Sequence, residues 1–309
     1  MMKALITDDV HPLLLEGLKQ RNYEITYNPK ITFEETLDCI NCFEGLVINS
    51  KIFCGEQLLE KASMLKWVAR LGSGMEVIDQ PACDAKGVRY FNSPEGNRDA
   101  VGEHALGLLL NLLRNITRSN NQIHHHIWQR EPNRGISLNG KTVGIIGFGN
   151  TGRAFAKVLT GFDVTILAHD KYSTGFSENG ITESNLDKIF DEADIISLHL
   201  PLTTETHHYA DSLFFQRFRK PIFLINTSRG KVVDTEALLA ACATGNILGA
   251  GLDVFENEQH QTFTTNDQNL WAKLLAEEKL LLTPHIAGWT HESKLLIAQT
   301  VLKKLDSLI

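Results

Sequence analysis

The stretch Lys141–Asp170 constrains the fold more than any other part of this chain, because it has the order strand, glycine turn, helix, strand, acid. A short apolar run, Val143–Ile146, leads into a G-x-G-x-x-G motif made by Gly147, Gly149 and Gly152. A helical pattern and a second apolar run follow, and Asp170 lies 23 residues after Gly147. This order predicts a strand–helix–strand unit that opens a doubly wound parallel sheet.

Each glycine of this turn has a physical task in a dinucleotide site. The first permits the tight turn, the second lets a pyrophosphate approach the backbone, and the third lets helix and strand pack closely. The N–H groups at the start of the helix then face the phosphates. Asp170 can accept hydrogen bonds from ribose hydroxyls and would repel a 2′-phosphate, so the stretch predicts NAD rather than NADP. The neighbouring Lys171 weakens that preference slightly.

The size and charge of the chain narrow the remaining choices. A chain of 309 residues is at the upper limit for one hydrophobic core, so two domains are expected. A net charge of −7 argues against a nucleic-acid partner or an anionic membrane surface. The first residues do not have the pattern of a signal peptide, and no apolar segment is long enough for a membrane span. We therefore predict a cytoplasmic protein.

The cysteine and histidine patterns indicate no metal site. Five scattered cysteines fit reduced thiols in the cytoplasm. Cys39 and Cys42 form a C-x-x-C pair, but no second ligand pair follows at zinc spacing. The three consecutive histidines His124–His126 would point in different directions on a helix, so they cannot converge on one ion.

Strand-like and helical patterns alternate along the whole chain. In the first part the strand-like runs are 3–8, 46–50, 66–70 and 88–91, and after the glycine turn they are 194–198, 222–226, 249–254 and 280–283. A long apolar helix is predicted over 98–118, a surface loop over 257–269, and an amphipathic tail over 291–309.

This alternation predicts an α/β fold of two doubly wound, Rossmann-like parallel-sheet domains with a cleft between them. Residues 1–97 plus 286–309 would form a discontinuous, flavodoxin-like substrate domain, and residues 98–285 the NAD-binding domain. Hinges are expected near residues 92–100 and 284–290.

Four segments at strand ends carry residues suited to chemistry, and each also has an ordinary structural interpretation. The loop Gly72–Gly74 can bind a carboxylate or phosphate through its N–H groups, or it is a plain tight turn. Arg229 can grip a carboxylate in a bidentate fork, or it forms a surface salt bridge. Glu258 can orient a histidine or be a solvated acid, and His285 can titrate in a catalytic range or be structural.

Together these segments resemble the D-isomer-specific 2-hydroxyacid dehydrogenase family over about residues 3–305. The shared motifs, in order, are RLGSGMEVID, GFGNTG, LHLPLTTET, NTSRGKVVD, GLDVFENE and TPHIAG. The resemblance implies an active site of Arg229, Glu258 and His285. His285 would move the hydroxyl proton while Glu258 holds its imidazole, and Arg229 would fix the substrate carboxylate.

The resemblance also implies binding residues. The NAD contacts would be Ser93, Gly147, Gly149, Asn150, Thr151, Gly152, Asp170, Leu200, Pro201, Thr227, Asp253 and His285–Gly288. The substrate contacts would be Arg70, Gly72, Ser73, Gly74 and Arg229. Gln259 stands where the family commonly has proline, and Trp289 stands where it often has serine; these differences bear on the substrate rather than on the reaction.

The pattern is most similar to the phosphoglycerate dehydrogenase branch, which implies oxidation of 3-phosphoglycerate for serine synthesis. Arg70, Lys86 and Arg98 are candidate partners for the phosphate. The chain ends soon after the family's closing helix, so no serine-sensing domain and no feedback inhibition through one are expected. The alternatives are a glyoxylate, hydroxypyruvate or general 2-keto acid reductase and, in another class, an NAD-sensing corepressor-like scaffold. A homodimer is expected, with the helix 98–118 as a candidate interface.

Overall fold

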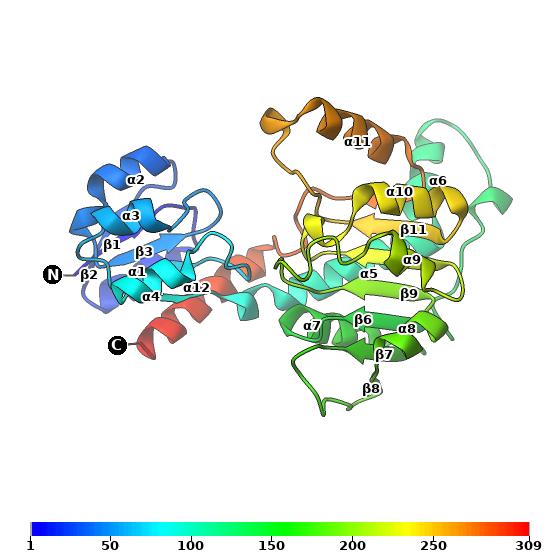
Figure 1. The fold of residues 1–309 in the computed structure, drawn as a ribbon, viewed down its shortest axis with the longest axis horizontal. Coiled ribbons are helices and arrows are strands. Elements are labelled where there is room, and N and C mark those ends of the chain that lie inside the picture. Colours follow the sequence, from blue (N-terminus) through cyan, green and yellow to red (C-terminus); the bar gives the residue numbers. More distant parts are fainter. Residues whose placement is uncertain (1, 309) are drawn as a thin grey trace. The chain divides into compact units, whose positions relative to one another are not determined.

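The computed structural model describes residues 2–308, which divide into two compact units (Figure 1). Unit 1 consists of the chain up to Arg98 together with the residues from Trp289 onward. Unit 2 consists of Asp99–Gly288. Within residues 2–308, no helix combines the length and the apolar character that crossing a membrane requires.

Unit 1 is built on a five-stranded parallel sheet in the order β2-β1-β3-β4-β5, the flavodoxin-like order. The strands are β1 (Met2–Ile6), β2 (Tyr23–Tyr27), β3 (Gly45–Ile48), β4 (Trp67–Arg70) and β5 (Arg89–Phe91). The helices are α1 (Pro12–Gln20), α2 (Phe33–Cys39), α3 (Glu56–Lys61), α4 (Gln80–Lys86) and α12 (His291–Asp306), and short 3-10 turns lie at η1 (Ile40–Cys42) and η2 (Pro94–Gly96).

Both faces of this sheet are covered by helices, because side chains alternate between the faces along each strand. Ala4 and Ile6 pack with residues of α1 and α12, whereas Leu5 lies in the opposite cluster with residues of α2, α3 and α4. The last helix completes this unit, and the side chain of Leu302 lies directly against Gly17 of α1.

Unit 2 contains a seven-stranded parallel sheet in the order β12-β11-β10-β9-β6-β7-β8. The strands are β6 (Thr142–Ile146), β7 (Thr165–His169), β8 (Ile181–Glu183), β9 (Ile195–Leu198), β10 (Ile222–Asn226), β11 (Ile247–Leu252) and β12 (Leu280–Leu282). Counted from β6, the first six strands follow the doubly wound order of dinucleotide-binding domains, and β12 adds a further edge strand.

Helices cover both faces of this sheet as well. Residues of α5 (Arg98–Arg114) and α7 (Asn150–Leu159) pack on one face. Residues of α8 (Leu186–Glu192), α9 (Ser212–Gln216), α10 (Thr235–Thr244) and α11 (Thr265–Ala276) pack on the other. The remaining helical segments are α6 (Ile116–His124), η3 (Glu131–Asn133), η4 (Gly230–Val232) and η5 (His260–Thr262).

The predicted α/β class with two parallel sheets is confirmed, and three local predictions are wrong. The edge strands β2 and β8 were not anticipated, because both are short and partly exposed and have a neighbour on one side only. The single helix expected over 98–118 is interrupted at Asn115, whose φ of 53° is left-handed and cannot continue a right-handed helix. The loop expected over 257–269 contains η5 and the start of α11, where Thr264 and Asp267 form a capping box.

Candidate functional site

The carboxyl-terminal edge of the seven-stranded sheet gathers most of the predicted site. Because all seven strands are parallel, the segment that follows each strand emerges at the same edge. The glycine turn follows β6, Asp170 follows β7, Leu200 and Pro201 follow β9, Arg229 follows β10, Asp253 and Glu258 follow β11, and His285 follows β12. The sheet thus places the glycine turn and Asp170 on one half of this edge, and the predicted catalytic residues together with Thr227 and Asp253 on the other.

The glycine turn has the close packing expected of a phosphate-binding turn. Gly147 has a φ of +91°, and a Cβ on it would lie 2.3 Å from the carbonyl oxygen of His199. A Cβ on Gly152 would lie 2.1 Å from the carbonyl oxygen of Gly147, so helix α7 approaches the strand as only glycine allows. A Cβ on Gly149 would meet nothing within 4 Å, which leaves open space at the start of α7 for a pyrophosphate. The turn therefore fits a dinucleotide.

Asp170 is held as a carboxylate at the end of β7. Its Oδ2 accepts from the N–H of Phe148 at 2.7 Å, and its Oδ1 accepts from the N–H groups of Tyr172 and Ser173, each at 2.9 Å. Burial raises the pKa of Asp170, but these backbone hydrogen bonds outweigh it and hold that pKa below its ordinary value. The acid is therefore ionised and oriented, as recognition of a ribose requires.

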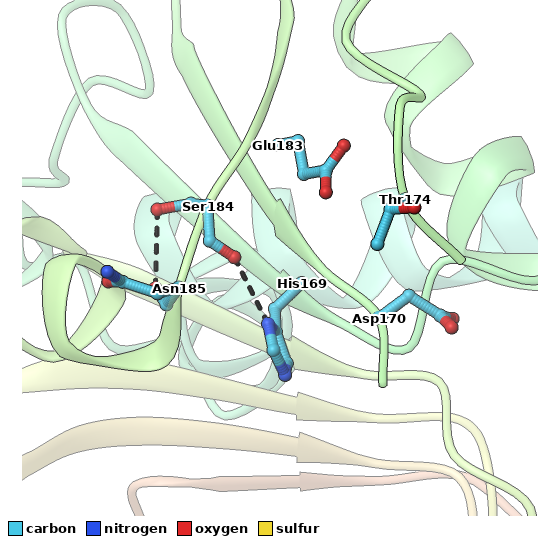
Figure 2. A pocket seen from close by; sticks show the side chains of 6 residues that line it. All are labelled: His169, Asp170, Thr174, Glu183, Ser184 and Asn185. Carbon is cyan, nitrogen blue, oxygen red and sulfur yellow. Dashed lines mark hydrogen bonds between the residues drawn. The ribbon is translucent and has the colours of Figure 1, made fainter. Parts of the chain in front are cut away.

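A shallow cavity of about 400 Å³ lies beside Asp170 at the ends of β7 and β8 (Figure 2). It is lined by His169, Asp170, Thr174, Glu183, Ser184 and Asn185. Figure 2 shows the His169 ring beside the carbonyl oxygen of Ser184, at 3.1 Å from Nδ1. The cavity contains two carboxylates, and the nearby Lys171 is paired with Glu205 at 2.5 Å. This charge distribution disfavours a phosphate on the ribose.

A buried histidine, His199, links the end of β9 to the helix that follows the glycine turn. His199 is only 7% exposed, and its Nε2 lies 2.8 Å from Ser197 Oγ while its Nδ1 lies 3.2 Å from Thr151 Oγ1. Burial lowers the pKa of His199 to about 3, so the ring is neutral. This contact joins the end of β9 to the first turn of α7.

Arg229 is presented by a folded loop after β10. The buried Asn226 accepts from Ser228 N at 3.0 Å and donates from Nδ2 to the Arg229 carbonyl oxygen at 3.0 Å. Arg229 Nη1 donates to the Ser228 carbonyl oxygen at 2.7 Å. Thr227 Oγ1 is buried without a hydrogen-bond partner within residues 2–308, so this hydroxyl is available to a bound molecule.

Asp253 fixes the segment that carries His285. Its carboxylate accepts from Thr283 Oγ1 at 2.6 Å and from the N–H groups of Ile286 at 2.9 Å and Ala287 at 2.7 Å. Burial raises the pKa of Asp253, yet hydrogen bonds, first among them one from His104, hold that pKa below its ordinary value. His104 could not be predicted from the sequence, because it lies within an apolar helix and contacts Asp253 only in the folded chain.

The Glu258–His285 pair is the chemically distinctive contact of the site. Glu258 Oε2 lies 2.8 Å from His285 Nδ1, and the two side chains are 36% and 53% exposed. A carboxylate can only accept, so Nδ1 carries the proton and Nε2 is left as the basic nitrogen. The backbone N–H of His285 donates to the Asp253 carbonyl oxygen at 2.8 Å, and this bond fixes the backbone from which the ring extends. An oriented, partly exposed imidazole of this kind can act as a general base.

An aromatic cluster supports the loop that carries Glu258. Trp271 of α11 lies 4.7 Å from Phe255 and 4.9 Å from His260, measured between ring centroids. Its Nε1 donates to the Asn257 carbonyl oxygen at 3.3 Å. These contacts hold the loop on both sides of Glu258, where Gln259 replaces the proline expected from the family pattern. The polar sequence of this region predicts a surface loop and gives no sign of the aromatic cluster.

The predicted substrate loop lies in unit 1, after β4. Ser93 is fully buried, accepts from the N–H of Gly72 at 2.8 Å and donates to the Arg70 carbonyl oxygen at 3.1 Å. Ser73 Oγ donates to Asn97 Oδ1 at 2.9 Å, and Arg70 Nη1 donates to the Leu71 carbonyl oxygen at 2.9 Å. Ser93 therefore braces this loop within its own unit, and the roles predicted for Ser93, Arg70 and Gly72–Gly74 stay predictions.

The C-x-x-C pair of the sequence lies in unit 1, at the end of α2 and in η1. Within residues 2–308, no group of three or more His, Cys, Asp or Glu side chains is arranged to hold a metal ion. Burial raises the pKa of the Cys39 thiol, which disfavours the reactive thiolate. Cys42 is exposed and its Sγ lies 3.2 Å from Asn41 Oδ1.

Comparison with known proteins gives consistent results over the whole chain. The family model described as "D-isomer specific 2-hydroxyacid dehydrogenase, NAD binding domain" matches residues 106–287, so the chain contains an NAD-binding domain. A D-3-phosphoglycerate dehydrogenase from Synechocystis is 30% identical over 100% of this chain and 54% of its own length, so this chain spans about half of that relative. A hydroxypyruvate reductase from Thermotoga maritima is 32% identical over 88% of this chain and 87% of its own length.

A solved structure shares the fold closely. The D-lactate dehydrogenase from Aquifex aeolicus, described as complexed with NAD and lactic acid, superposes with a TM-score of 0.84 at 28% identity. The match covers 99% of this chain and 95% of that one.

Proposed function

The chain belongs to the D-isomer-specific 2-hydroxyacid dehydrogenase family, and we propose that it transfers a hydride between nicotinamide and a D-2-hydroxy acid. One observation carries this proposal. The contact of 2.8 Å between Glu258 and His285 Nδ1 leaves Nε2 of a half-exposed imidazole free at the edge that also carries Arg229 and the glycine turn.

The proposed roles of the three side chains follow from their chemistry. In the oxidising direction, His285 Nε2 takes the hydroxyl proton of the substrate, and Glu258 stabilises the imidazolium that forms. The guanidinium of Arg229 binds the substrate carboxylate in a bidentate fork and polarises the neighbouring oxygen. The glycine turn and Asp170 would hold NAD, which would supply the acceptor for the hydride of the hydroxyl-bearing carbon. In reduction, His285 returns the proton to the keto oxygen.

We propose 3-phosphoglycerate as the substrate, which would place the protein at the entry to serine synthesis. The D-3-phosphoglycerate dehydrogenase from Synechocystis supports this assignment by its identity along the entire chain. A phosphate needs cationic partners, and Arg70 and Arg98 are candidates because they lie near the carboxyl ends of β4 and β5. Lys86 is a poorer candidate. It ends α4, and a helix that joins two parallel strands ends at the opposite edge of the sheet.

A general 2-keto acid reductase is the second candidate within the same family. The hydroxypyruvate reductase from Thermotoga maritima supports it, because this chain covers most of that relative's length. The lactic acid complex of the Aquifex aeolicus enzyme supports it as well, since lactate has no phosphate. Such a substrate would need Arg229 but no second cationic group.

The deciding experiment follows the absorbance of NADH as it is oxidised with 3-phosphohydroxypyruvate, hydroxypyruvate, glyoxylate and pyruvate in parallel. We expect the largest kcat/KM with 3-phosphohydroxypyruvate. A preference for an unphosphorylated acid would replace the substrate assignment and keep the reaction. Tight NADH binding without turnover of any of the four acids would contradict the enzyme proposal and favour the NAD-sensing scaffold.

We further propose a homodimer. The exposed apolar side chains favour an interface on α6 rather than on α5. Helix α5 buries most of its apolar residues inside unit 2. Ile116 and Ile123 of α6 are instead 52% and 50% exposed, and Trp128 just beyond is 80% exposed. Contiguous exposed apolar side chains mark an association surface. Light scattering should give twice the chain mass, and Trp128→Glu should shift it toward one chain mass. A single chain mass for the unaltered protein would exclude the dimer.

A further inference from the structure

A second histidine–carboxylate pair lies in unit 2, apart from the proposed catalytic pair. His208 Nε2 is 2.8 Å from Glu256 Oε2, and the side chains are 35% and 25% exposed. On the other side of the ring, Nδ1 lies 3.9 Å from Asp234 Oδ2. Because Glu256 can only accept, Nε2 carries the proton of this contact. Both ring nitrogens therefore face protein carboxylates.

Glu256 is fixed by a second contact as well. Its other oxygen, Oε1, accepts from the backbone N–H of Thr235 at 2.9 Å. Burial raises the pKa of Glu256, but the hydrogen bonds from Thr235 and His208 outweigh it and lower that pKa. Glu256 is therefore an ionised, partly buried carboxylate that depends on these partners.

The pair joins three loops at the carboxyl edge of the sheet. Its acid lies two residues before Glu258, on the same loop after β11. Its histidine donates a backbone hydrogen bond to the Lys231 carbonyl oxygen at 2.7 Å, two residues after Arg229. A Cβ on Gly230 would lie 1.9 Å from the backbone of Phe255, so the Arg229 and Glu258 loops touch directly. A change in the His208–Glu256 contact would thus reach both proposed catalytic loops.

The backbone of His208 is unusual and adds weight to this assignment. Its φ of 51° lies in the left-handed region, which only a few per cent of residues other than glycine adopt, with histidine among the more frequent of them. A histidine kept at such a position needs contacts that offset the strain. The side-chain hydrogen bond to Glu256 and the backbone hydrogen bond to Lys231 are such contacts.

We infer that His208 is a positioning residue that, through Glu256, sets the mutual placement of the Arg229 and Glu258 loops. The inference rests on the proposed hydride-transfer function. His208 touches neither substrate nor cofactor in this role, because both of its ring nitrogens face carboxylates of the chain.

Three variants test this role. His208→Gly removes the imidazole and tolerates the left-handed backbone, and His208→Gln restores a neutral N–H donor toward Glu256. His126→Gly is the matched control, since His126 is an exposed histidine with a φ of 60°. Turnover per NADH-binding site is measured together with KM, and hydrogen–deuterium exchange is measured over residues 227–235 and 253–258.

We expect His208→Gly to lower kcat per NADH-binding site by about tenfold to a hundredfold, because small misplacements of reacting groups have effects of this size. Exchange over both segments should become faster, NADH affinity should hold, and His208→Gln should recover most of the loss. A purely structural role would reduce the number of NADH-binding sites and leave kcat per site unchanged.

Two results would overturn the inference. One is wild-type kcat per site and wild-type exchange in His208→Gly. The other is an equal loss in His126→Gly. If the unaltered protein turns over none of the acids, the proposed function fails by itself, and the exchange data still decide whether His208 holds the two loops.

Discussion

The two histidine–glutamate pairs of unit 2 are alike in contact and different in setting. Each has a nitrogen–oxygen distance of 2.8 Å, and the two acids, Glu256 and Glu258, belong to one loop. Both histidines have left-handed backbones, with φ of 51° for His208 and 55° for His285. The His285 side chain is 53% exposed, however, and that of His208 only 35%.

The difference lies in which nitrogen the carboxylate occupies and in what the other nitrogen faces. Glu258 contacts Nδ1 of His285, and Nε2 is the nitrogen that the proposed function assigns to the substrate proton. Glu256 takes Nε2 of His208, and Asp234 lies near Nδ1, so no nitrogen faces outward. The same pair of residue types can thus serve proton transfer or loop placement, depending on whether one nitrogen is left open.

Removing the exposed imidazole gives the largest expected effect. His285→Ala should lower kcat by about 10²- to 10⁴-fold, the usual contribution of a positioned general base. NADH affinity, measured by the fluorescence of the bound nicotinamide, should stay close to that of the unaltered protein. If NADH binding is lost together with turnover, His285 has a structural role, and the two histidine–glutamate pairs would not differ in function.

Matched amide substitutions in the two acids should separate the pairs next. An amide can donate a hydrogen bond, so Glu258→Gln can turn the His285 ring to the tautomer whose Nε2 carries the proton. We expect kcat to fall by about 10²-fold, whereas Glu256→Gln should lower it by about tenfold. Steady-state kinetics of both variants, normalised to NADH-binding sites, give this comparison. Equal losses would mean that the two glutamates do the same work.

Much of the fold follows from local pattern, since strands such as β6 and β10 are continuous buried runs. A central parallel strand is buried on both faces, so its sequence is apolar throughout. β8 has only three residues on an edge, and its pairing with β7 depends on the loop between them. Such an edge strand leaves little trace in the sequence.

The site residues fall into the same two groups: those that local sequence pattern predicts and those that only the folded chain brings together. The glycine turn and Asp170 lie in one continuous unit, so spacing alone predicts them. Glu258 and His285 are 27 residues apart and look like ordinary loop residues until the family motifs join them. His208 and Glu256 are 48 residues apart, and the contact exists only because three loops meet at one edge of the sheet. No periodicity or spacing in the sequence indicates such a contact.

A third histidine, His199, contacts the hydroxyl groups of Ser197 and Thr151, and its effect should be seen in stability. Its pKa is about 3 in the fold against 6.5 ordinarily, so the unfolded chain binds a proton between these values and the folded chain does not. Its stabilising contribution is therefore complete above pH 6.5 and is lost as the pH falls toward 3. From pH 7 to 5 the loss should be about 2 kcal/mol.

Urea unfolding at pH 7 and pH 5 measures this loss, and His199→Gln should show a smaller decrease over the same interval. The acids Asp170 and Asp253 do not interfere, because their lowered pKa values act only below the ordinary aspartate value of 3.8. If the variant does not fold, the ring resonances of His199 decide. A ring that titrates near pH 6.5 in the folded protein would contradict its burial as a neutral group.

The smallest expected effect concerns Asp170, whose carboxylate accepts hydrogen bonds from backbone N–H groups rather than from a histidine. Asp170→Asn removes the charge that repels a 2′-phosphate and keeps one side-chain oxygen, which can accept either from Phe148 or from Tyr172 and Ser173. The ratio of NADPH to NADH affinity should rise by about tenfold, which corresponds to about 1.4 kcal/mol. Fluorescence titration with both nucleotides gives the ratio. Glu183→Gln neutralises the second acid of the neighbouring cavity and should change the ratio less, because Asp170 contacts the glycine turn through Phe148 whereas Glu183 contacts Gly175 and Phe176. A larger shift from Glu183→Gln than from Asp170→Asn would mean that Glu183, and not Asp170, is the acid that faces the ribose and discriminates between NADH and NADPH.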